Sequence, residues 1–406
     1  MGPQNNAKLL FVISDLAVGG TERQVAALAP ELVRLGWSVT IYSFADGKVR
    51  QQLESAGIAV RLVPGKHGLT ASSRTMRALS VCVGAVHLLW IMLTLKPKIV
   101  HCFLPAAYLI ATPLAFLARV QVRIMSRRSL SNYQKSAFIR SAERSLHRLN
   151  HAALGNSLKV VEQLKEEGVP QDRLGLIYNG INFSVYTNSG EPGVYRKRLG
   201  IESDEFVMCI AANLIPYKGH HELIEALGHS AAKLPEKWRL LVAGRDDGVG
   251  GVLKEQVALL GIADHVSFLG ARDDIPTILG ASDVGLLCSH EEGFSNAILE
   301  GMASSLPMIV TDVGGNAEAV IEGVTGLVVP ARDPARLADA IIQLAYDPAL
   351  RQRMGSSGRL RIVEHFGLQP FVRSHDRLYH GLLDGKLVSD ISEARVSPSA
   401  RATIQA

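Results

Sequence analysis

The sequence predicts an α/β protein built from two tandem Rossmann-like domains. A length of 406 residues suits two domains of ordinary size. A hydrophobic content of 47% with 37 glycines is typical of a globular α/β chain. Short apolar runs also alternate with helical segments twice along the chain. This alternation predicts parallel sheets that are covered on both faces and bind ligands at the carboxyl ends of their strands.

The first series of strands is expected at residues 8–14, 38–42, 59–63, 99–103 and 122–126. After the first strand come Gly19 and Gly20 and a helix beginning near Thr21, where Thr21 and Gln24 fit a capping box. Backbone N–H groups at that helix start would point into the glycine loop, where they could bind phosphate. The alternative is a tight strand-to-helix turn with no ligand.

An apolar segment at residues 78–95 precedes the fourth strand. We expect a helix buried in the α/β layer rather than a membrane-spanning helix, because its length is borderline and the next element must rejoin the sheet. A contact that lies on a bilayer remains open.

The second series begins after a Gly- and Pro-containing linker at residues 188–193. Its strands are expected at residues 206–211, 239–243, 265–269, 283–288, 307–311 and 326–329. The expected divisions are a first domain over 1–183, a second domain over 184–369, a helix over 370–387 packing back toward the first domain, and a disordered tail over 388–406.

Charge is distributed unevenly. Residues 1–190 contain 22 Lys and Arg against 10 Asp and Glu, whereas the whole chain carries a net charge of only +5. Such a basic half suits anionic lipid or a phosphate-bearing acceptor, and an ordinary solvated surface is an equally good interpretation. No nucleic-acid motif accompanies it, and only 6% of residues are aromatic, so nucleic acid is not expected.

The four cysteines are far apart and form no Cys-x-x-Cys pair, so we expect buried, reduced thiols in a cytoplasmic protein. Residues 1–6 lack the basic and apolar regions of a signal peptide, which also argues against export.

The stretch from Glu292 to Glu300 says most about chemistry. An apolar strand leads into a loop with Glu292, and a helix with Ser295 as N-cap carries Glu300 in its second turn. On a continuous helix the two acids would lie roughly 80° and about 12 Å apart, so they should contact two parts of one extended ligand. The N–H groups of Ser295, Asn296 and Ala297 could bind phosphate between them.

The order and spacing of these motifs resembles glycosyltransferase family 4, retaining enzymes of the GT-B fold that use nucleotide-sugar donors. The resemblance covers residues 8–385 and is carried by Gly19 to Arg23, His101, Asn179 to Asn182, Lys218 to His220, Gly244, Glu292 to Phe294, Glu300, Gly314, Gly315 and Glu318. It implies an acceptor-side domain over 1–183 and a donor domain over 184–369, with a cleft between them. It also implies a nucleotide sugar as co-substrate, a UDP-sugar in preference to a GDP-sugar. No further cofactor is implied, and no metal is expected because the sequence shows no convincing Asp-x-Asp site.

The resemblance implies a role for each matching residue. Glu292 would contact the transferred sugar, Lys218 the diphosphate and His101 a sugar hydroxyl, and these three are the catalytic candidates. Glu300 would accept hydrogen bonds from the ribose. The candidate donor-binding set is Gly19, Gly20, Asn213, Lys218, Gly244, Phe294, Ser295, Asn296, Ala297 and Glu300.

One position departs from the family pattern. Many members have an Arg five residues before the motif Lys, where this chain has Asn213. Asn donates hydrogen bonds but carries no charge. Arg23, Arg127 and Arg128 are therefore candidates for the missing cation or for an acceptor phosphate.

The expected function is a hexosyltransferase acting on a lipid-linked or polysaccharide acceptor in envelope or exopolysaccharide biosynthesis, in the cytoplasm and with peripheral contact to an anionic membrane. A catalytically silent nucleotide-sugar-binding protein and a sugar-nucleotide epimerase on the same fold are the alternatives. An NAD-dependent enzyme is disfavoured because the first loop lacks Gly-x-Gly-x-x-Gly.

Overall fold

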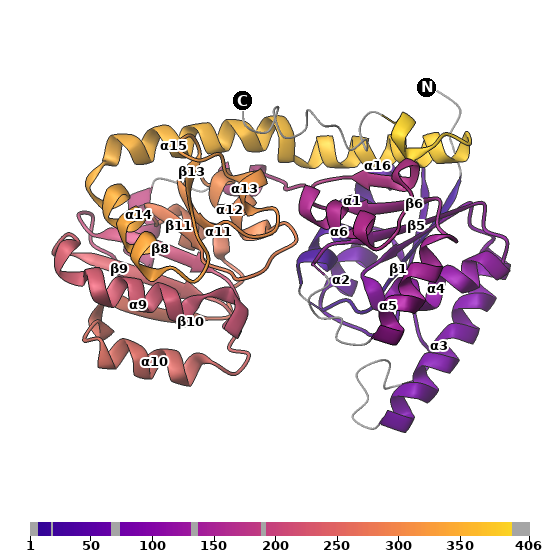
Figure 1. Cartoon of the computed structure of the whole chain (residues 1–406), viewed down its shortest axis with the longest axis horizontal. Helices are drawn as coiled ribbons and strands as arrows, with labels where there is room; N and C mark the ends of the chain where they lie inside the picture. Colours follow the sequence, from indigo (N-terminus) through magenta and orange to yellow (C-terminus); the bar gives the residue numbers. More distant parts are fainter. Residues whose placement is uncertain (1–6, 18, 66–73, 131–136, 188–191, 392–406) are drawn as a thin grey trace. The chain divides into compact units, whose positions relative to one another are not determined.

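The computed structural model describes residues 7–17, 19–65, 74–130, 137–187 and 192–391 (Figure 1). Within these ranges the chain forms two compact units. Unit 1 runs to Gly180 and resumes at Leu368, and unit 2 is Ile181–Gly367. The sequence predicts the corresponding divisions after residues 183 and 369. Helix α16 (Leu368–Leu383) therefore belongs to unit 1.

Unit 1 contains a seven-stranded parallel sheet in the order β3-β2-β1-β4-β5-β6-β7. Its strands are β1 (Lys8–Ile13), β2 (Ser38–Ser43), β3 (Ala59–Leu62), β4 (Ile99–Phe103), β5 (Val122–Arg127), β6 (Ala152–Gly155) and β7 (Leu174–Leu176). The first five lie where the sequence predicts them. The sequence prediction missed β6 and β7, which are short and contain Ala and Gly rather than β-branched residues.

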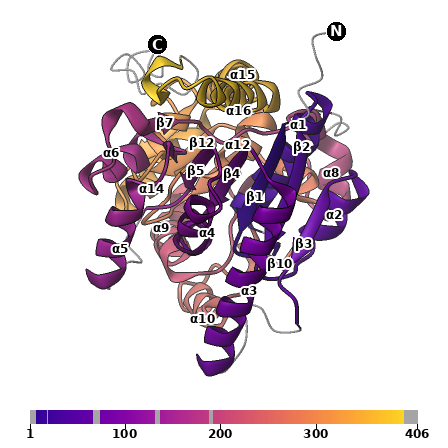
Figure 2. The same cartoon turned by 90° about the vertical axis from the view of Figure 1, so that its right-hand side faces the viewer.

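Side chains that alternate along the strands pack into two layers of core. Leu9 and Phe11 of β1 lie with the helices α1 (Gly20–Arg34), α2 (Val49–Ser55) and α16. Leu10 and Val12 lie with α3 (Arg74–Leu95), α4 (Pro105–Leu117) and α6 (Leu158–Glu166) on the other face. The sheet is thus covered on both faces, as parallel sheets usually are (Figure 2).

Unit 2 contains a six-stranded parallel sheet in the order β10-β9-β8-β11-β12-β13. Its strands are β8 (Phe206–Ala211), β9 (Trp238–Ala243), β10 (Val266–Gly270), β11 (Val284–Leu287), β12 (Met308–Thr311) and β13 (Gly326–Val329). One face packs against α9 (His220–Ser230), α10 (Gly250–Leu259) and α14 (Pro334–Tyr346). The remaining helices of this unit are α7 (Ser184–Thr187), α8 (Pro192–Arg198), α11 (Ile275–Gly280), α12 (Asn296–Ala303), α13 (Asn316–Ala319) and α15 (Pro348–Arg361).

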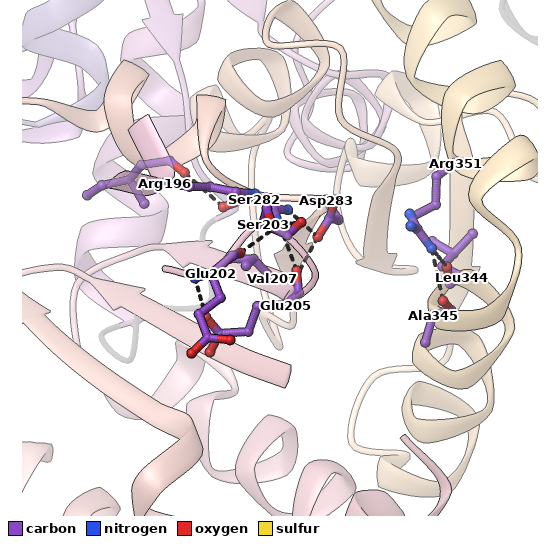
Figure 3. A network of polar contacts seen from close by, with 11 residues as sticks. Arg196, Glu202, Ser203, Glu205, Val207, Ser282, Asp283, Leu344, Ala345 and Arg351 are labelled. Carbon is purple, nitrogen blue, oxygen red and sulfur yellow. Dashed lines mark hydrogen bonds and ion pairs between the residues drawn. The ribbon is translucent and has the colours of Figure 1, made fainter. Parts of the chain in front are cut away.

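Arg196 links α8 to the amino-terminal edge of this sheet through hydrogen bonds (Figure 3). Its Nη2 donates to Asp283 Oδ2 at 2.7 Å, and its Nη1 donates to the carbonyl of Glu205 at 2.8 Å. Asp283 also accepts from the Val207 N–H at 2.8 Å. This network lies at the amino-terminal ends of β8 and β11. It therefore stabilises the sheet at the edge opposite to the strand ends that concern ligand binding.

Two local expectations were wrong. Helix α1 begins at Gly20 with Gly19 as N-cap, and the Thr21–Gln24 capping box does not form. The Gln24 side chain instead bonds both the N–H and the C=O of Gly180, at 2.9 and 2.8 Å. Pro192 and Gly193, assigned to the linker, begin α8, while residues 188–191 lie outside the described ranges.

The tail was expected to be disordered from residue 388. Val388 and Ile391 are in fact buried in the core of unit 1, because they pack beside α16 where Gly381 leaves room. Residues 392–406, like residues 1–6, lie outside the described ranges.

Helix α3 covers the expected apolar segment but is not buried on all sides. Its N-terminal half extends beyond the neighbouring helices of unit 1 in both views (Figures 1 and 2). Cys82 on this helix is exposed, contrary to expectation, whereas Cys102, Cys209 and Cys288 are buried. No helix among the described residues is both long enough and apolar enough to cross a bilayer.

Candidate functional site

The strand order of unit 2 reverses between β8 and β11, which are adjacent in the sheet although β9 and β10 lie between them in the chain. Crevices at such reversals, outside the carboxyl ends of the strands, are where open parallel sheets bind ligands. The loop after β8 carries Asn213 and Lys218, and the loop after β11 carries Ser289 and Glu292. The predicted polar residues therefore gather at the position that the topology favours.

Lys218 and Glu292 form an ion pair across this reversal. Lys218 Nζ lies 2.5 Å from Glu292 Oε1, and the same oxygen accepts from Ser289 Oγ at 2.8 Å. The two side chains are only 16% and 12% exposed, so water screens the pair less than a surface pair. Removing either partner would leave a largely desolvated charge, which a bound anion or hydroxyl could compensate.

Two glycines allow these loops to approach each other. Gly219, with φ of +71°, follows Lys218 at the start of α9, and a Cβ there would collide with the carbonyl oxygen of Cys288. Gly314, with φ of +54°, follows β12, and its Cβ would collide with the carbonyl oxygen of Glu292. The absence of a side chain at each glycine thus lets its segment pack closely against the loop that holds Glu292.

Helix α12 begins immediately after this loop. Ser295 is its N-cap as predicted, but its side chain makes no capping hydrogen bond. Asn296 and Ala297 form the half-buried first turn, and Glu300 in the second turn is 7% exposed. Phe294 was predicted to contact the donor, but its side chain is 4% exposed and packs on Phe366 with the ring centroids 5.3 Å apart. Its ring is therefore part of the core.

Asn213 binds the neighbouring loop. Its Oδ1 accepts from the backbone N–H of Arg245 at 3.2 Å. Gly244 makes this possible, since a Cβ there would collide with the carbonyl oxygen of Ala212. Arg245 is 62% exposed and forms a two-point ion pair with Asp247, at 2.6 and 3.0 Å. Arg245 thus lies beside Asn213, the position at which the family pattern has an Arg. The sequence interpretation did not consider Arg245.

The predicted residues of unit 1 lie at the corresponding reversal between β1 and β4. The Glu22 carboxyl folds back over Gly19, where a Cβ would collide with it. Burial raises the pKa of Glu22 to about 7, while its backbone hydrogen bond and the charge of Arg128 act in the opposite direction. Burial lowers the pKa of Arg128 to about 10, and its Nη2 donates to Asn179 at 2.5 Å. Arg23 is exposed on α1, and Gly20 is its first residue.

His101 lies inside unit 1, between Ser126 of β5 and Tyr379 of α16. It is completely buried, with Nδ1 2.7 Å from the Tyr379 hydroxyl and Nε2 2.7 Å from Ser126 Oγ. Burial, followed by electrostatic interactions with His375 and Arg128, holds the pKa of His101 well below its usual value. A neutral ring bonded at both nitrogens links α16 to the sheet. Its contact with a sugar hydroxyl stays a prediction.

Arg127 forms its ion pairs inside unit 1. Its side chain is completely buried and pairs with Glu167 at 2.5 Å and Glu143 at 3.4 Å. Burial raises the pKa of the Glu167 carboxyl, but hydrogen bonds from His147 and Arg127 outweigh this effect and lower the pKa to about 2. The charge of Arg127 is therefore compensated inside unit 1.

Leu104 is a further residue that sequence reasoning missed. It follows β4 with φ of +70° and ψ of 153°, a region that residues other than glycine rarely occupy. Strained backbone of this kind is concentrated at functional positions, and Leu104 lies at the strand reversal of unit 1. Nothing in its residue type signals this conformation.

Comparison with known families assigns both units. Residues 193–361 match the family described as glycosyl transferases group 1, and residues 19–180 match the glycosyl transferase 4-like domain. The chain belongs to the group 1, GT4-like glycosyltransferases. Each matched segment contains the strand reversal described above for its unit.

Individual relatives agree with this family. The chain is 30% identical over 227 residues to N-acetyl-alpha-D-glucosaminyl L-malate synthase of Bacillus anthracis, covering 56% of this chain and 58% of that one. It is 26% identical over 299 residues to the capsular polysaccharide biosynthesis glycosyltransferase CapM of Staphylococcus aureus, covering 71% and 78%. Several other curated relatives are matched over about half of their length.

The fold has clear counterparts among solved structures. Anabaena HepE in complex with UDP superposes with a TM-score of 0.80 at 22% identity, covering 92% of this chain and all of that one. HepE has also been solved with UDP-glucose. The two parallel sheets of this glycosyltransferase family member are thus those of a GT-B fold.

Proposed function

We propose that this protein is a retaining glycosyltransferase that moves a sugar from a nucleoside-diphosphate sugar to an acceptor hydroxyl. The observation that carries the proposal is the Lys218–Glu292 ion pair, which bridges the strand reversal of unit 2 inside the segment matched to the group 1 family. UDP and UDP-glucose are bound by HepE, which shares the fold, so a UDP-sugar is the first donor to test.

In this proposal the donor separates the ion pair. Lys218 meets the diphosphate, Glu292 meets the sugar hydroxyls and Glu300 meets the ribose. The bond from the anomeric carbon to the β-phosphate oxygen breaks and a bond to the acceptor oxygen forms on the same face. The acceptor proton passes to the departing diphosphate oxygen. Lys218 offsets the charge that accumulates on that leaving group.

Arg245 is proposed as the second cation of the diphosphate site. It lies in the same unit as Lys218, its backbone is bonded to Asn213, and its side chain is exposed. Arg127 is unsuitable because it is buried and paired. Arg128 and Arg23, in unit 1, remain candidates for a phosphate of the acceptor.

The acceptor is proposed to be a glycan or a lipid-linked glycan of envelope or capsule assembly, made on the cytoplasmic side. The likeness to CapM supports this class. A nucleotide-sugar-binding protein without turnover is the second candidate, because Asn213 removes one charge from the usual site.

The test is release of UDP from UDP-glucose and other UDP-sugars, with and without added acceptor lipid or oligosaccharide. We expect Lys218→Ala to lower kcat by roughly 100-fold or more, as loss of a transition-state contact does. Glu300→Ala should raise KM for the donor by roughly 10-fold with a smaller effect on kcat. Equal kinetics for the wild type and Lys218→Ala would refute the assignment, and donor binding without any release would favour the second candidate.

A further inference from the structure

The outward face of α3 carries a continuous apolar stripe. The stripe consists of Leu79, Val83, Val86, Trp90 and Leu93, which are 66%, 40%, 71%, 59% and 53% exposed. At 100° per residue these five positions fall within an arc of about 80°, so they form one line along roughly 21 Å of helix. They are therefore one surface and not scattered apolar residues.

The opposite face of the same helix is already packed. Leu88, Ile91 and Met92 are at most 5% exposed and belong to the core layer beneath the sheet. A helix that packs on one side and faces water on the other normally has polar residues on the outer side. Here both faces are apolar, and contiguous exposed patches of this kind mark interaction surfaces.

Trp90 is held in place on this surface. Its ring stacks on His87 with centroids 5.9 Å apart and an interplanar angle of 14°. Thr94 Oγ1 donates to the Trp90 carbonyl at 2.8 Å, so the polar Thr94 side chain is also tied to the helix. An exposed, oriented indole is the side chain most suited to the boundary between lipid headgroups and acyl chains.

Basic residues border the C-terminal end of the stripe. Helix α4 packs beside α3 and ends in Phe116 and Leu117, which are 51% and 67% exposed. The Arg123 guanidinium lies over the Phe116 ring, 5.5 Å from its centroid. The exposed cations nearest to these ends in the chain are Lys96, Lys98 and Arg119.

We propose that the α3 stripe, with Phe116 and Leu117, docks this protein on the surface of an anionic lipid bilayer. The apolar side chains would enter the headgroup boundary, while Lys96, Lys98 and Arg119 meet lipid phosphates. Residues 1–190 contain 22 basic and 10 acidic residues. This positive charge favours an anionic bilayer over a second copy of the chain, because two copies of the same charge repel each other. The proposal concerns a surface of unit 1 and does not depend on the reaction of unit 2.

Intrinsic fluorescence gives a direct readout. Of the three tryptophans, Trp37 and Trp238 are 3% and 2% exposed, so Trp90 alone faces solvent. Vesicles of equimolar phosphatidylcholine and phosphatidylglycerol should shift its emission to the blue, and brominated acyl chains should quench it. Trp90→Phe should abolish both signals while co-flotation with vesicles persists.

Two variants separate the apolar and the charge contributions. Val86→Gln with Leu93→Gln should lower the fraction that floats with these vesicles at least 10-fold, because two apolar side chains that would be buried in the bilayer are lost. Lys96→Gln with Lys98→Gln should lower binding several-fold and remove most of its salt dependence. Tyr346→Gln with Leu360→Gln, which alters two similarly exposed apolar residues of unit 2, should float like the wild type.

The outcomes are distinguishable. Absence of flotation with any vesicle, or equal flotation of the wild type and the Val86/Leu93 variant, would overturn the proposal. A lipid-independent dimer that the same variant dissociates would also overturn it and would assign the stripe to a second copy. UDP release, measured in parallel without vesicles, shows whether the proposed reaction survives in either case.

Discussion

At the scale of single residues, the ligand-free site is held by charges that a donor would have to rearrange. Lys218 and Glu292 compensate each other at 2.5 Å, and Arg245 is compensated by Asp247. Both acidic partners are in unit 2, so the cations are oriented without any ligand. A diphosphate binding there would exchange one anion for another, and the site would not have to bury a new charge.

Arg245 can be tested separately from Lys218. We expect Arg245→Ala to weaken UDP binding by roughly 3- to 10-fold, because it removes a charge-assisted contact that is partly exposed to water. Isothermal titration with UDP measures this directly. Lys237→Ala is the matched control, since Lys237 is an exposed, paired cation at the opposite edge of the same sheet. Equal affinities for the wild type and Arg245→Ala would exclude Arg245 from the diphosphate site.

Glu22 should make stability depend on pH. Burial raises its pKa in the folded chain from 4.5 to about 7, so the folded state holds this proton more tightly than the unfolded state. Its contribution to stability is therefore fully present below about pH 4.5 and is lost as the pH rises through about 7. Glu22→Gln keeps a neutral side chain at every pH and should remove this dependence.

The measurement is urea unfolding of both proteins at acidic and at alkaline pH. The difference in free energy of unfolding between wild type and Glu22→Gln should change by up to about 3 kcal/mol across the titration, with the wild type losing stability toward high pH. A difference that is constant with pH would mean that Glu22 ionises normally.

At the scale of elements, α16 is attached to unit 1 through buried polar contacts as well as apolar ones. Tyr379 of α16 bonds His101 of β4, and Phe371 packs against Gly180, where a Cβ would collide with its side chain. The helix closes one face of the first sheet although it follows all of unit 2 in sequence.

Tyr379→Phe should therefore lower the free energy of unfolding by about 1–2 kcal/mol, because His101 Nδ1 would remain buried without its partner. Tyr346→Phe, which removes a hydroxyl from a residue that is 62% exposed, should change stability by less than about 0.5 kcal/mol. Urea titration of the two variants side by side checks the prediction. An unchanged midpoint for Tyr379→Phe would show that the hydrogen bond contributes no net stability.

Elements with strong local signals were predictable. β4, β8 and β13 have the predicted bounds because continuous apolar runs are bounded by turn residues. β6 was missed because Ala-Ala-Leu-Gly has no strand preference, and only pairing with β5 and β7 makes it a strand. The loop of Glu292 could be found from its motif. The burial of His101 and Phe294 could not, since each depends on a partner far away in the sequence, Tyr379 and Phe366.

At the scale of the whole molecule, chemistry and charge are divided between the units. Asn213, Lys218, Arg245, Glu292 and Glu300 all belong to unit 2, while the excess of basic residues lies in residues 1–190. Each unit has its own hydrophobic core. The proposed donor should therefore stabilise unit 2 directly, whereas the surface proposed to bind lipid lies on unit 1.

Hydrogen exchange with and without UDP tests this division. A ligand that binds only the folded form of unit 2 stabilises this unit by about 2.7 kcal/mol when the ligand concentration is a hundred times Kd. Amide exchange that requires unfolding of unit 2 should then be slower by roughly 100-fold. We expect protection in β8, α9, β11 and α12, whereas amides in the core of β2 and α2 should exchange as before. Glu300→Ala should require a higher UDP concentration for the same protection. Equal protection of both cores would show that the units unfold together, and protection confined to unit 1 would contradict the assignment of the donor site.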